Sequence, residues 1–291
     1  MVTAFTDEGV VSPYEELMAY EYLYSKSGTS RSKMSRVLTE NGTRPSRAMA
    51  AVEGLMPDES KYGEVKEYVD SRIGGFSVLV EGTPQFPHCL RTQKDPLPVF
   101  YYRGDLSLVE SRCVSVVGTR RPSEKGALAA RRIARALADR HITVVAGLAT
   151  GIDTEAMTEA ISCGGSVIGV IGTPIDRYYP KENRALQDEV ATRHLLISQV
   201  PIYHYDHQPF NTRRFYFPER NVTMAALSEA TIIVEAGETS GTRTQARACI
   251  DQGKMLVFLP GVVETVTWAR AFLEKGAKVA SSVTEAMELV G

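Results

Sequence analysis

The sequence is poor in cysteine, has no long apolar run and is dominated by neither sign of charge. Its four cysteines are scattered without a CxxC pair, which predicts reduced, mostly buried thiols. No apolar run approaches the ~20 residues that span a bilayer. The first sixteen residues have no basic start and no apolar core, so no signal peptide is expected. A soluble cytoplasmic protein is therefore predicted.

Charge and composition narrow the class of protein further. Lys plus Arg number 33 against 35 Asp plus Glu, a formal net charge of -2, which argues neither for nor against a nucleic-acid partner. Hydrophobic residues make up 43% and charged residues 23% of the chain, which excludes a disordered protein. A length of 291 residues suits one large domain or two modest ones.

The N-terminal part of the sequence predicts short helices and a domain boundary at Gly74–Gly75. Ser12 is expected to be the N-cap of the first helix, with Pro13 at the first helical position. Further helices are expected at about 30–38, from 45 and at 58–72. We predict an N-terminal helical module over 1–75 and a larger domain over 76–291, which opens with extended pieces at 77–80 and 99–102.

From Cys113 onward, short apolar runs alternate with amphipathic stretches. Runs without polar alternation suit strands that are buried on both faces of a parallel sheet. Alternation of such strands with helices predicts a doubly wound α/β fold, in which ligands bind beyond the carboxyl ends of the strands. The expected strands are 114–117, 143–146, 167–171, 195–198, 231–234 and 255–259. The expected helices are 124–139, 153–162, 181–192, 220–228, 242–251 and 264–274.

The first core strand is followed by a glycine turn, two arginines and a helix start, residues 118–123 (GTRRPS). Free amides at a helix start favour an anion, and the arginines add positive charge beside them. The segment is neither GxGxxG nor GxxxxGK[ST], so it carries no dinucleotide or P-loop fingerprint. It predicts a phosphate site, and a glycine turn with solvated arginines is the alternative. The candidate residues are Gly118, Thr119, Arg120, Arg121 and Ser123.

The second strand ends in a turn of small residues, 147–153 (GLATGID). Gly147, Ala149 and Gly151 bring the backbone close to whatever fills the crevice. Asp153 is expected to cap the next helix, with a catalytic or nucleotide-contacting role as the alternative. The loop after the third strand is interpreted as mainly structural.

The most informative segment is 211–221 (NTRRFYFPERN), in which arginines and aromatic residues interleave. Single-strand binders need this mixture, because guanidinium groups hold phosphates while rings stack on unpaired bases. The alternative is that some rings face the core and the arginines coat the surface. The candidate residues are Arg213, Arg214, Phe217, Arg220 and Asn221.

A further small-residue turn, 235–242 (EAGETSGT), ends the fifth strand and leads into a helix. Its candidates for contact with an anion are Ser240, Gly241 and Thr242. These turns converge on one rim only if the sheet is parallel.

Taken together, the turns resemble the DNA-processing protein A (DprA/Smf) family. The resemblance rests on residues 116–123, 147–153, 176, 179–183, 217–221, 235–236, 240–241 and 259–261. It implies an extended Rossmann-like domain that binds and protects single-stranded DNA and helps to load RecA recombinase during DNA uptake, and it implies a homodimer. Arg120 and Arg214 would then contact phosphate, Phe217 would stack on a base, and Arg220 and Asn221 would line the same pocket.

Three sites depart from the family pattern, and one of them is Thr242-Arg243, which replaces the usual small and then apolar residue after Ser240-Gly241. Val222 replaces a second arginine after Arg-Asn, and Met157 stands where a histidine is common. Arg243, after the Ser-Gly-Thr turn, is expected to restore the missing positive charge. His204 and His207 lack the carboxylate or thiol spacing that would complete a metal site, so no metal and no cofactor are expected.

Two other functions remain open. A nucleotide-binding or nucleotide-hydrolysing enzyme of the lysine-decarboxylase-like Rossmann family would place Arg120 on a phosphate and Glu235 or Glu238 near the sugar. In an interaction module, the 12–75 helices would dock a protein. The family is not regarded as catalytic, and no nucleophile–base pair is visible in the sequence, so a nonenzymatic protein is the leading expectation.

Overall fold

The computed structural model describes residues 4–6, 9–26, 28–54, 57–92 and 96–291. The chain forms two compact units, each described here by itself. The N-terminal unit comprises Met1–Arg103, Thr173–Arg177 and Ile197–Tyr216. The α/β unit comprises Gly104–Gly172, Tyr178–Leu196 and Phe217–Gly291.

The α/β unit is built on a sheet whose strands are short, apolar and buried. Along the sheet they follow the order β11-β10-β9-β5-β6-β7-β8, and the neighbours from β11 to β7 pair in parallel. Every residue of β5, β6 and β7 is buried, as expected for strands covered by helices on both faces. The strands are β5 (Cys113–Val117), β6 (Thr143–Ala146), β7 (Val167–Ile171), β8 (Leu195–Ser198, which leaves this unit after Leu196), β9 (Ala230–Ile233), β10 (Met255–Phe258) and β11 (Lys278–Val279).

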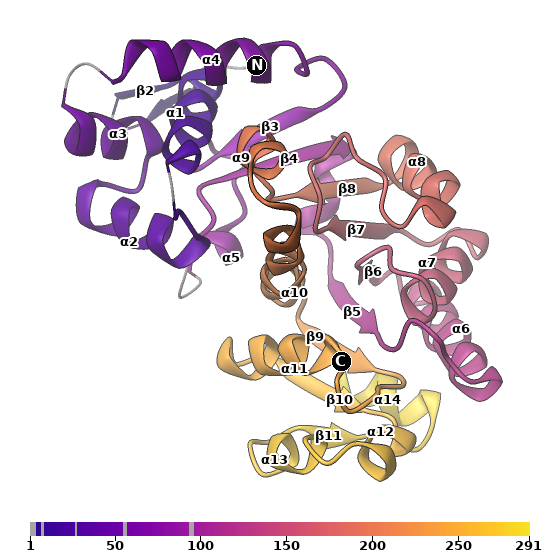
Figure 1. The fold of residues 1–291 in the computed structure, drawn as a ribbon. Coiled ribbons are helices and arrows are strands. Elements are labelled where there is room, and N and C mark those ends of the chain that lie inside the picture. Colours follow the sequence, from indigo (N-terminus) through magenta and orange to yellow (C-terminus); the bar gives the residue numbers. More distant parts are fainter. Residues whose placement is uncertain (1–3, 7–8, 27, 55–56, 93–95) are drawn as a thin grey trace. The chain divides into compact units, whose positions relative to one another are not determined.

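Helices cover the sheet of the α/β unit on both faces (Figure 1). Helix α6 packs against α7 and α14, whereas α11 packs against β9, β10 and α13. Along the sheet, the chain moves in one direction from β5 to β7 and in the opposite direction from β9 to β11. Since both sets of connections are right-handed, the helices that follow β5 and β6 lie on the opposite face of the sheet from the helix that follows β9. The helices are η1 (Leu106–Glu110), α6 (Glu124–Ala138), α7 (Ile152–Ser162), η2 (Lys181–Asn183), α8 (Arg184–Arg193), α10 (Tyr216–Leu227, whose first residue belongs to the N-terminal unit), α11 (Thr242–Asp251), α12 (Pro260–Thr265), α13 (Ala269–Leu273) and α14 (Val283–Leu289).

The strand order reverses between β5 and β9. From β5 the chain proceeds outward through β6, β7 and β8, and then returns to place β9 on the other side of β5. The register pairs Val114 with Ala230 and Val117 with Ile233, so the carboxyl ends of both strands reach the same edge. Ligands of open α/β sheets bind at such a reversal.

The predicted α/β pattern of parallel strands and helices is confirmed, and two local predictions are wrong. The helix expected at 264–274 is two short helices, α12 and α13, because Val266 adopts an extended conformation and Trp268 is buried. Asp153 does not cap α7. Gly151, with φ 81°, occupies the N-cap position, and the Asp153 carboxylate accepts a hydrogen bond from the Gly147 N–H at 2.9 Å.

The N-terminal unit combines helices with two antiparallel strand pairs, β1–β2 and β3–β4. Ser12 caps α1 with Pro13 at its first position, as the sequence predicts. The elements are β1 (Ala4–Thr6), β2 (Gly9–Val11), α1 (Pro13–Ser25), α2 (Arg31–Asn41), α3 (Pro45–Glu53), α4 (Glu59–Asp70), β3 (Ser77–Val80), α5 (His88–Arg91), β4 (Val99–Gly104), α9 (Ile202–His207) and η3 (Phe210–Phe215). Strands β3 and β4 group with these helices, and the domain boundary at Gly74–Gly75 stays a prediction.

A buried carboxylate fixes the start of α9 in the N-terminal unit. Glu21 on α1 accepts hydrogen bonds from the backbone N–H groups of Ile202 and Tyr203, at 2.8 and 3.0 Å, and from the Tyr101 hydroxyl. Burial raises the pKa of Glu21 to about 7, against the effect of these donors.

Candidate nucleic-acid interface

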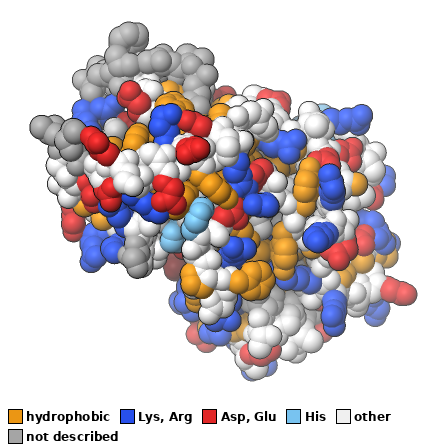
Figure 2. Space-filling view, turned by 45° about the horizontal axis from the view of Figure 1, so that its top comes forward, with side chains coloured by type: hydrophobic (Ala, Val, Ile, Leu, Met, Phe, Trp, Pro, Cys, Tyr) orange, Lys and Arg blue, Asp and Glu red, His pale blue; other side chains and the backbone are white. Residues whose placement is uncertain are grey.

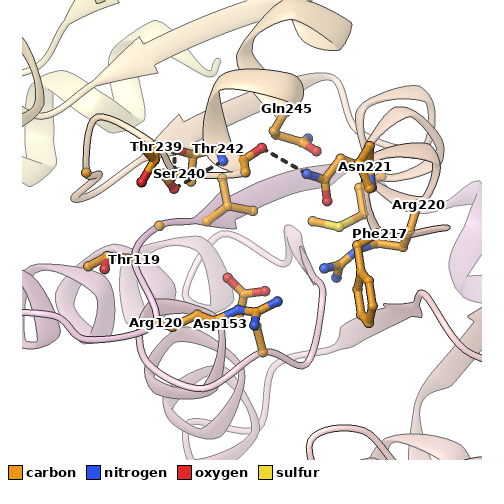
Figure 3. Close-up of a pocket in the computed structure, with 17 residues that line it drawn as sticks. Thr119, Arg120, Asp153, Phe217, Arg220, Asn221, Thr239, Ser240, Thr242 and Gln245 are labelled. Carbon is orange, nitrogen blue, oxygen red and sulfur yellow. Dashed lines mark hydrogen bonds between the residues drawn. The ribbon is translucent and has the colours of Figure 1, made fainter. Parts of the chain in front are cut away.

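A pocket of about 400 Å³ opens where the strand order of the α/β unit reverses. The turns after β5 and β9 form two of its sides, and α10 forms another (Figure 3). It is lined by Val117, Gly118, Thr119, Arg120, Ala149, Asp153, Phe217, Pro218, Arg220, Asn221, Met224, Gly237, Thr239, Ser240, Gly241, Thr242 and Gln245.

The turn between β9 and α11 is held by its own hydroxyls and by α10. The Ser240 Oγ accepts hydrogen bonds from the Thr242 N–H at 3.2 Å and from the Thr242 hydroxyl at 2.9 Å. The Asn221 side-chain amide donates to the Gly241 carbonyl oxygen at 3.0 Å, as Figure 3 shows. Asn221 therefore fixes the position of this turn across the pocket.

A cation and an aromatic ring lie together at this pocket. The Arg120 guanidinium carbon is 6.0 Å from the centre of the Phe217 ring, within the range of a cation–π interaction. The Phe217 ring is half-buried and lies over Gly172, the residue after β7. A β-carbon added at Gly172 would be 2.8 Å from the Cδ1 atom of Phe217. The Arg120 side chain is exposed. The pair presents a positive charge beside a flat apolar surface.

Below this pair, the floor of the pocket holds a buried arginine. Arg220 is 6% exposed, and its Nη1 donates to the Val170 carbonyl oxygen at 3.0 Å. Burial lowers the pKa of the Arg220 guanidinium, and the nearby charge of Asp153 opposes that shift. Burial likewise raises the pKa of the Asp153 carboxyl, while the charge of Arg220 and the N–H groups of Gly147 and Ala149 act in the opposite direction.

The start of α6 is bound by a carboxylate of the protein itself, that of Glu235. The Glu235 carboxylate accepts hydrogen bonds from the Ser123 N–H at 3.1 Å and from the Ser123 hydroxyl at 2.7 Å. The Ser123 Oγ in turn accepts the Gly126 N–H at 3.0 Å, so Ser123 is the N-cap that the sequence predicts. A Glu carboxylate occupies the place where a phosphate was expected.

Comparison with known proteins decides the family. The sequence model of the family described as DNA recombination-mediator protein A matches residues 77–291. The chain belongs to this family. It is 33% identical to the DNA processing protein DprA of Streptococcus pneumoniae over 213 residues, 72% of this chain and 72% of that protein. It is 31% identical to the DprA of Bacillus subtilis over 65% of this chain and 62% of that protein.

Solved structures of this family share the fold. The DNA processing protein A of Streptococcus pneumoniae superposes with a TM-score of 0.76 and 24% identity, over 97% of this chain and 99% of that one. The protein of Helicobacter pylori, a structure described for its single-stranded DNA binding mode, superposes with a TM-score of 0.63 and 28% identity, over 73% of this chain and 94% of that one. The Rossmann-like α/β fold implied by the sequence motifs is thereby confirmed.

In this member of the DNA recombination-mediator protein A family, many of the site residues predicted from the sequence line one pocket. Gly147, which does not line the main pocket, lines a small adjoining cavity with Gly172 and Tyr179. Arg121, Ser123, Gly151 and Arg243 line neither of these cavities. Arg213 and Arg214 belong to η3 of the N-terminal unit. The predicted residues that line the main pocket are Gly118, Thr119, Arg120, Ala149, Phe217, Arg220, Asn221, Ser240, Gly241 and Thr242.

Several lining residues were not among the sequence-predicted site residues, and helical spacing identifies two of them. Met224 lies three residues after Asn221 on α10, and Gln245 lies three residues after Thr242 on α11. Residues three or four apart share a helix face, so this spacing was the available signal. The buried Gln245 amide donates to the Thr231 hydroxyl at 3.2 Å, whereas its Oε1 has no hydrogen-bond partner among the residues that the structure describes.

The two carboxylates that the enzyme alternative requires are engaged elsewhere. Glu235 binds Ser123, and the Glu238 carboxylate accepts the Thr267 N–H at 2.9 Å. Neither side chain lines the pocket. Among the described residues, no group of three or more His, Cys, Asp and Glu is placed to hold a metal ion. In the same part of the chain, no helix is long and apolar enough to cross a membrane.

Proposed function

We propose that the pocket at the β5–β9 reversal binds single-stranded DNA without cutting it. The observation that supports this most is the pairing of an exposed guanidinium, Arg120, with the ring of Phe217 at a pocket where α/β folds bind ligands. A strand without base pairs needs both elements, a cation for its phosphates and a ring for its bases. The described DNA-binding mode of the Helicobacter pylori relative adds to this support.

Each side of the pocket binds a different part of the single-stranded DNA. Arg120 and the Ser240–Thr242 turn bind a phosphate, because they supply a charged donor, hydroxyls and the start of α11. Phe217 stacks on a base. Arg220 adds positive charge from below, and Asn221 holds the turn in place.

Local groups, rather than the total charge, carry this binding. Basic and acidic side chains are interspersed over the face seen in Figure 2, in keeping with the net charge of -2. Affinity for DNA must then come from a few placed cations, and its dependence on salt measures how many there are.

We further infer a role in recombination from family membership. In that role, the protein protects single-stranded DNA and assists loading of a RecA-type recombinase, and it acts as a homodimer. Light scattering of the purified protein tests the dimer. Recombinase filament assembly on single-stranded DNA, with and without this protein, tests the loading role.

A salt titration with a labelled oligothymidine tests DNA binding directly. With three or more phosphates contacted, the slope of log affinity against log salt should be about −2 or steeper. Arg120→Ala should make that slope shallower by about 0.7. Phe217→Ala should weaken binding by about 1–3 kcal/mol and leave the slope unchanged.

Two control variants remove similar side chains outside the pocket. Arg193→Ala deletes an exposed charge on α8, and Leu128→Ala deletes an exposed apolar side chain on α6. Both should bind as the unchanged protein does. A flat salt slope, or equal affinity for duplex and oligothymidine, contradicts the proposal, and turnover of a nucleoside monophosphate favours the enzyme alternative instead.

A further inference from the structure

A groove of about 280 Å³ lies on the α/β unit between α6 and the start of α14. It shares no lining residue with the pocket at the β5–β9 reversal. Apolar side chains from α6, from α14 and from the segment after β10 form its walls, together with two basic residues of α6. We call it the α6–α14 groove, and the lining residues that carry the argument are Lys125, Leu128, Arg132, Leu259, Pro260 and Val283.

The α6–α14 groove leaves apolar surface in contact with water. Leu128 is 42% exposed, whereas Leu137 of the same helix is fully buried. Leu259, Pro260 and Val283 of the groove are half-buried. A single exposed leucine is ordinary, but apolar side chains that gather in a groove mark a surface for a partner. Burial of these side chains against a partner would stabilise a complex.

The basic residues of α6 differ in their partners. Arg131 and Arg135 form ion pairs with carboxylates of α7. Lys125 and Arg132, which line the groove, are exposed and form no ion pair with a carboxylate of the described residues. The protein therefore neutralises the arginines that face α7 and leaves positive charge at the groove. This charge is complementary to an acidic partner.

The start of α14 does not add to this attraction for an acidic partner. The Ser282 Oγ accepts the Glu285 N–H at 3.1 Å, and the Glu285 carboxylate accepts the Ser281 N–H at 2.7 Å. These contacts satisfy the start of the helix from within the protein. The positive charge at the groove comes from Lys125 and Arg132.

We propose that the α6–α14 groove docks an acidic peptide segment of a partner protein, whose apolar side chain enters the groove while its carboxylates pair with Lys125 and Arg132. Residues three and four apart share a helix face, so Lys125, Leu128 and Arg132 form one row along α6 with the leucine between the cations. The row is about 10 Å long. It therefore fits a segment in which acidic residues stand on both sides of an apolar one.

Other classes of partner fit the α6–α14 groove less well. None of the described lining residues is aromatic, so an unpaired polynucleotide would find no ring on which to stack. A flat anionic membrane would meet the cations but would leave the groove unfilled. Drug-sized ligands occupy pockets of ~300–1,000 Å³, so the groove suits one or a few side chains of a peptide.

Fluorescence polarisation with a labelled nonapeptide tests the proposal. The probe has Leu-Phe-Leu at its centre and three aspartates on each side, and it should bind less tightly as salt rises. Leu128→Ala should weaken binding of the probe by about five-fold to 30-fold. Arg132→Ala should weaken it by about two-fold to five-fold, because its partner would be an exposed ion pair. The urea midpoint should stay the same, since both side chains are exposed.

Reversal of charge at the α6–α14 groove gives the sharpest result. The double variant Lys125→Glu with Arg132→Glu should lose the acidic probe and bind a second probe in which lysines replace the aspartates. Two control variants remove similar exposed side chains elsewhere: Arg140→Ala, just after α6, and Val52→Ala on α3. Both should bind the acidic probe as the unchanged protein does.

The outcomes separate this inference from the proposed DNA pocket. All variants of the α6–α14 groove should bind oligothymidine normally, whereas Arg120→Ala and Phe217→Ala should bind the acidic probe normally. No binding of the acidic probe, equal binding of the lysine probe by the unchanged protein, or full binding by Leu128→Ala overturns the peptide site. Weaker oligothymidine binding by Arg132→Ala assigns the groove to a polynucleotide instead. Leu128-dependent sedimentation with phosphatidylglycerol vesicles assigns it to a membrane surface.

Discussion

The guanidinium of Arg220 lies directly against the α-carbon of Gly147. A β-carbon added at Gly147 would stand 1.2 Å from the Arg220 Nη1 and 2.2 Å from its Cζ, so no other residue fits there without displacing the arginine. Arg220 is buried and its Nη1 donates a hydrogen bond to the Val170 carbonyl oxygen, so moving the guanidinium away from Gly147 would break that bond. The absent side chain at position 147 thus determines where the buried cation sits under the pocket.

Gly147→Ala should therefore damage both the fold and the pocket. Overpacking at a buried site costs about 1–3 kcal/mol, and the displaced guanidinium would leave the pocket floor. We expect a lower urea midpoint and weaker oligothymidine binding. Gly63→Ala on α4 is the control, because a β-carbon at Gly63 meets nothing within 4 Å and alanine favours a helix. Normal binding by Gly147→Ala would show that the position of Arg220 is irrelevant to the ligand.

Asn221→Ala should loosen the turn between β9 and α11. The lost hydrogen bond to Gly241 is worth about 1 kcal/mol, and the side chain carries no charge. Affinity for oligothymidine should fall a few-fold at an unchanged salt slope. Gln252→Ala is the control, because it also removes one side-chain amide hydrogen bond. The Gln252 amide donates to the Val222 carbonyl oxygen at 3.2 Å, and Gln252 does not line the pocket. Equal effects of the two variants on binding would contradict the role given to Asn221.

Ser123→Ala should lower stability without removing a phosphate contact. Loss of an N-cap costs about 1 kcal/mol, and the Glu235 carboxylate also loses a hydroxyl donor. Urea unfolding should show a reduced free energy, as it should for Ser282→Ala, the cap of α14. The salt slope for oligothymidine should stay the same. A shallower salt slope in Ser123→Ala would contradict this prediction and would indicate that Ser123 contacts a phosphate, as the sequence predicts.

The contribution of Glu21 to the stability of the protein should fall as the pH rises from about 4.5 to about 7. Burial raises the pKa of Glu21 to about 7 from an ordinary value of 4.5, so the folded chain binds the proton over a range where the unfolded chain has lost it. Its contribution to stability is complete below pH 4.5 and is lost through pH 7, with a slope of at most about 1.4 kcal/mol per pH unit. Urea titrations across this range should show the loss as a difference between the unchanged protein and Glu21→Gln.

Glu21→Gln should flatten this pH dependence, whatever it does to absolute stability. Glu16→Gln is the control, because Glu16 is a buried carboxylate on the same helix that accepts hydrogen bonds from Ser46. It should leave the decline in place. An unchanged decline in Glu21→Gln would assign the titration to another group.

The core of the α/β unit was largely readable from the sequence. The expected strands 143–146, 167–171 and 195–198 coincide with β6, β7 and β8. Strands that are buried on both faces have unbroken runs of apolar residues, which can be recognised in the sequence. The glycine turns after β5 and β9 were also predicted to meet. That prediction succeeded because parallel strands bring their carboxyl ends to one edge.

The partners of individual side chains were not readable in the same way. Glu235 lies 112 residues from Ser123, and only the parallel pairing of β5 with β9 brings its carboxylate to the start of α6. Asp153 looked like a helix cap, but Gly151 takes that place and frees the carboxylate for Gly147. Partners distant in sequence leave no periodic signal.

The sequence by itself determined the alternation of buried strands and helices, the caps Ser12 and Ser123, and the concentration of rings and arginines in 211–221, because these follow from local periodicity and residue type. Only the tertiary structure decided which rings face water and which guanidinium is buried. Phe210 and Tyr216 look alike in the sequence, yet one is 84% exposed and the other 7%, since burial depends on which distant residues pack against each ring.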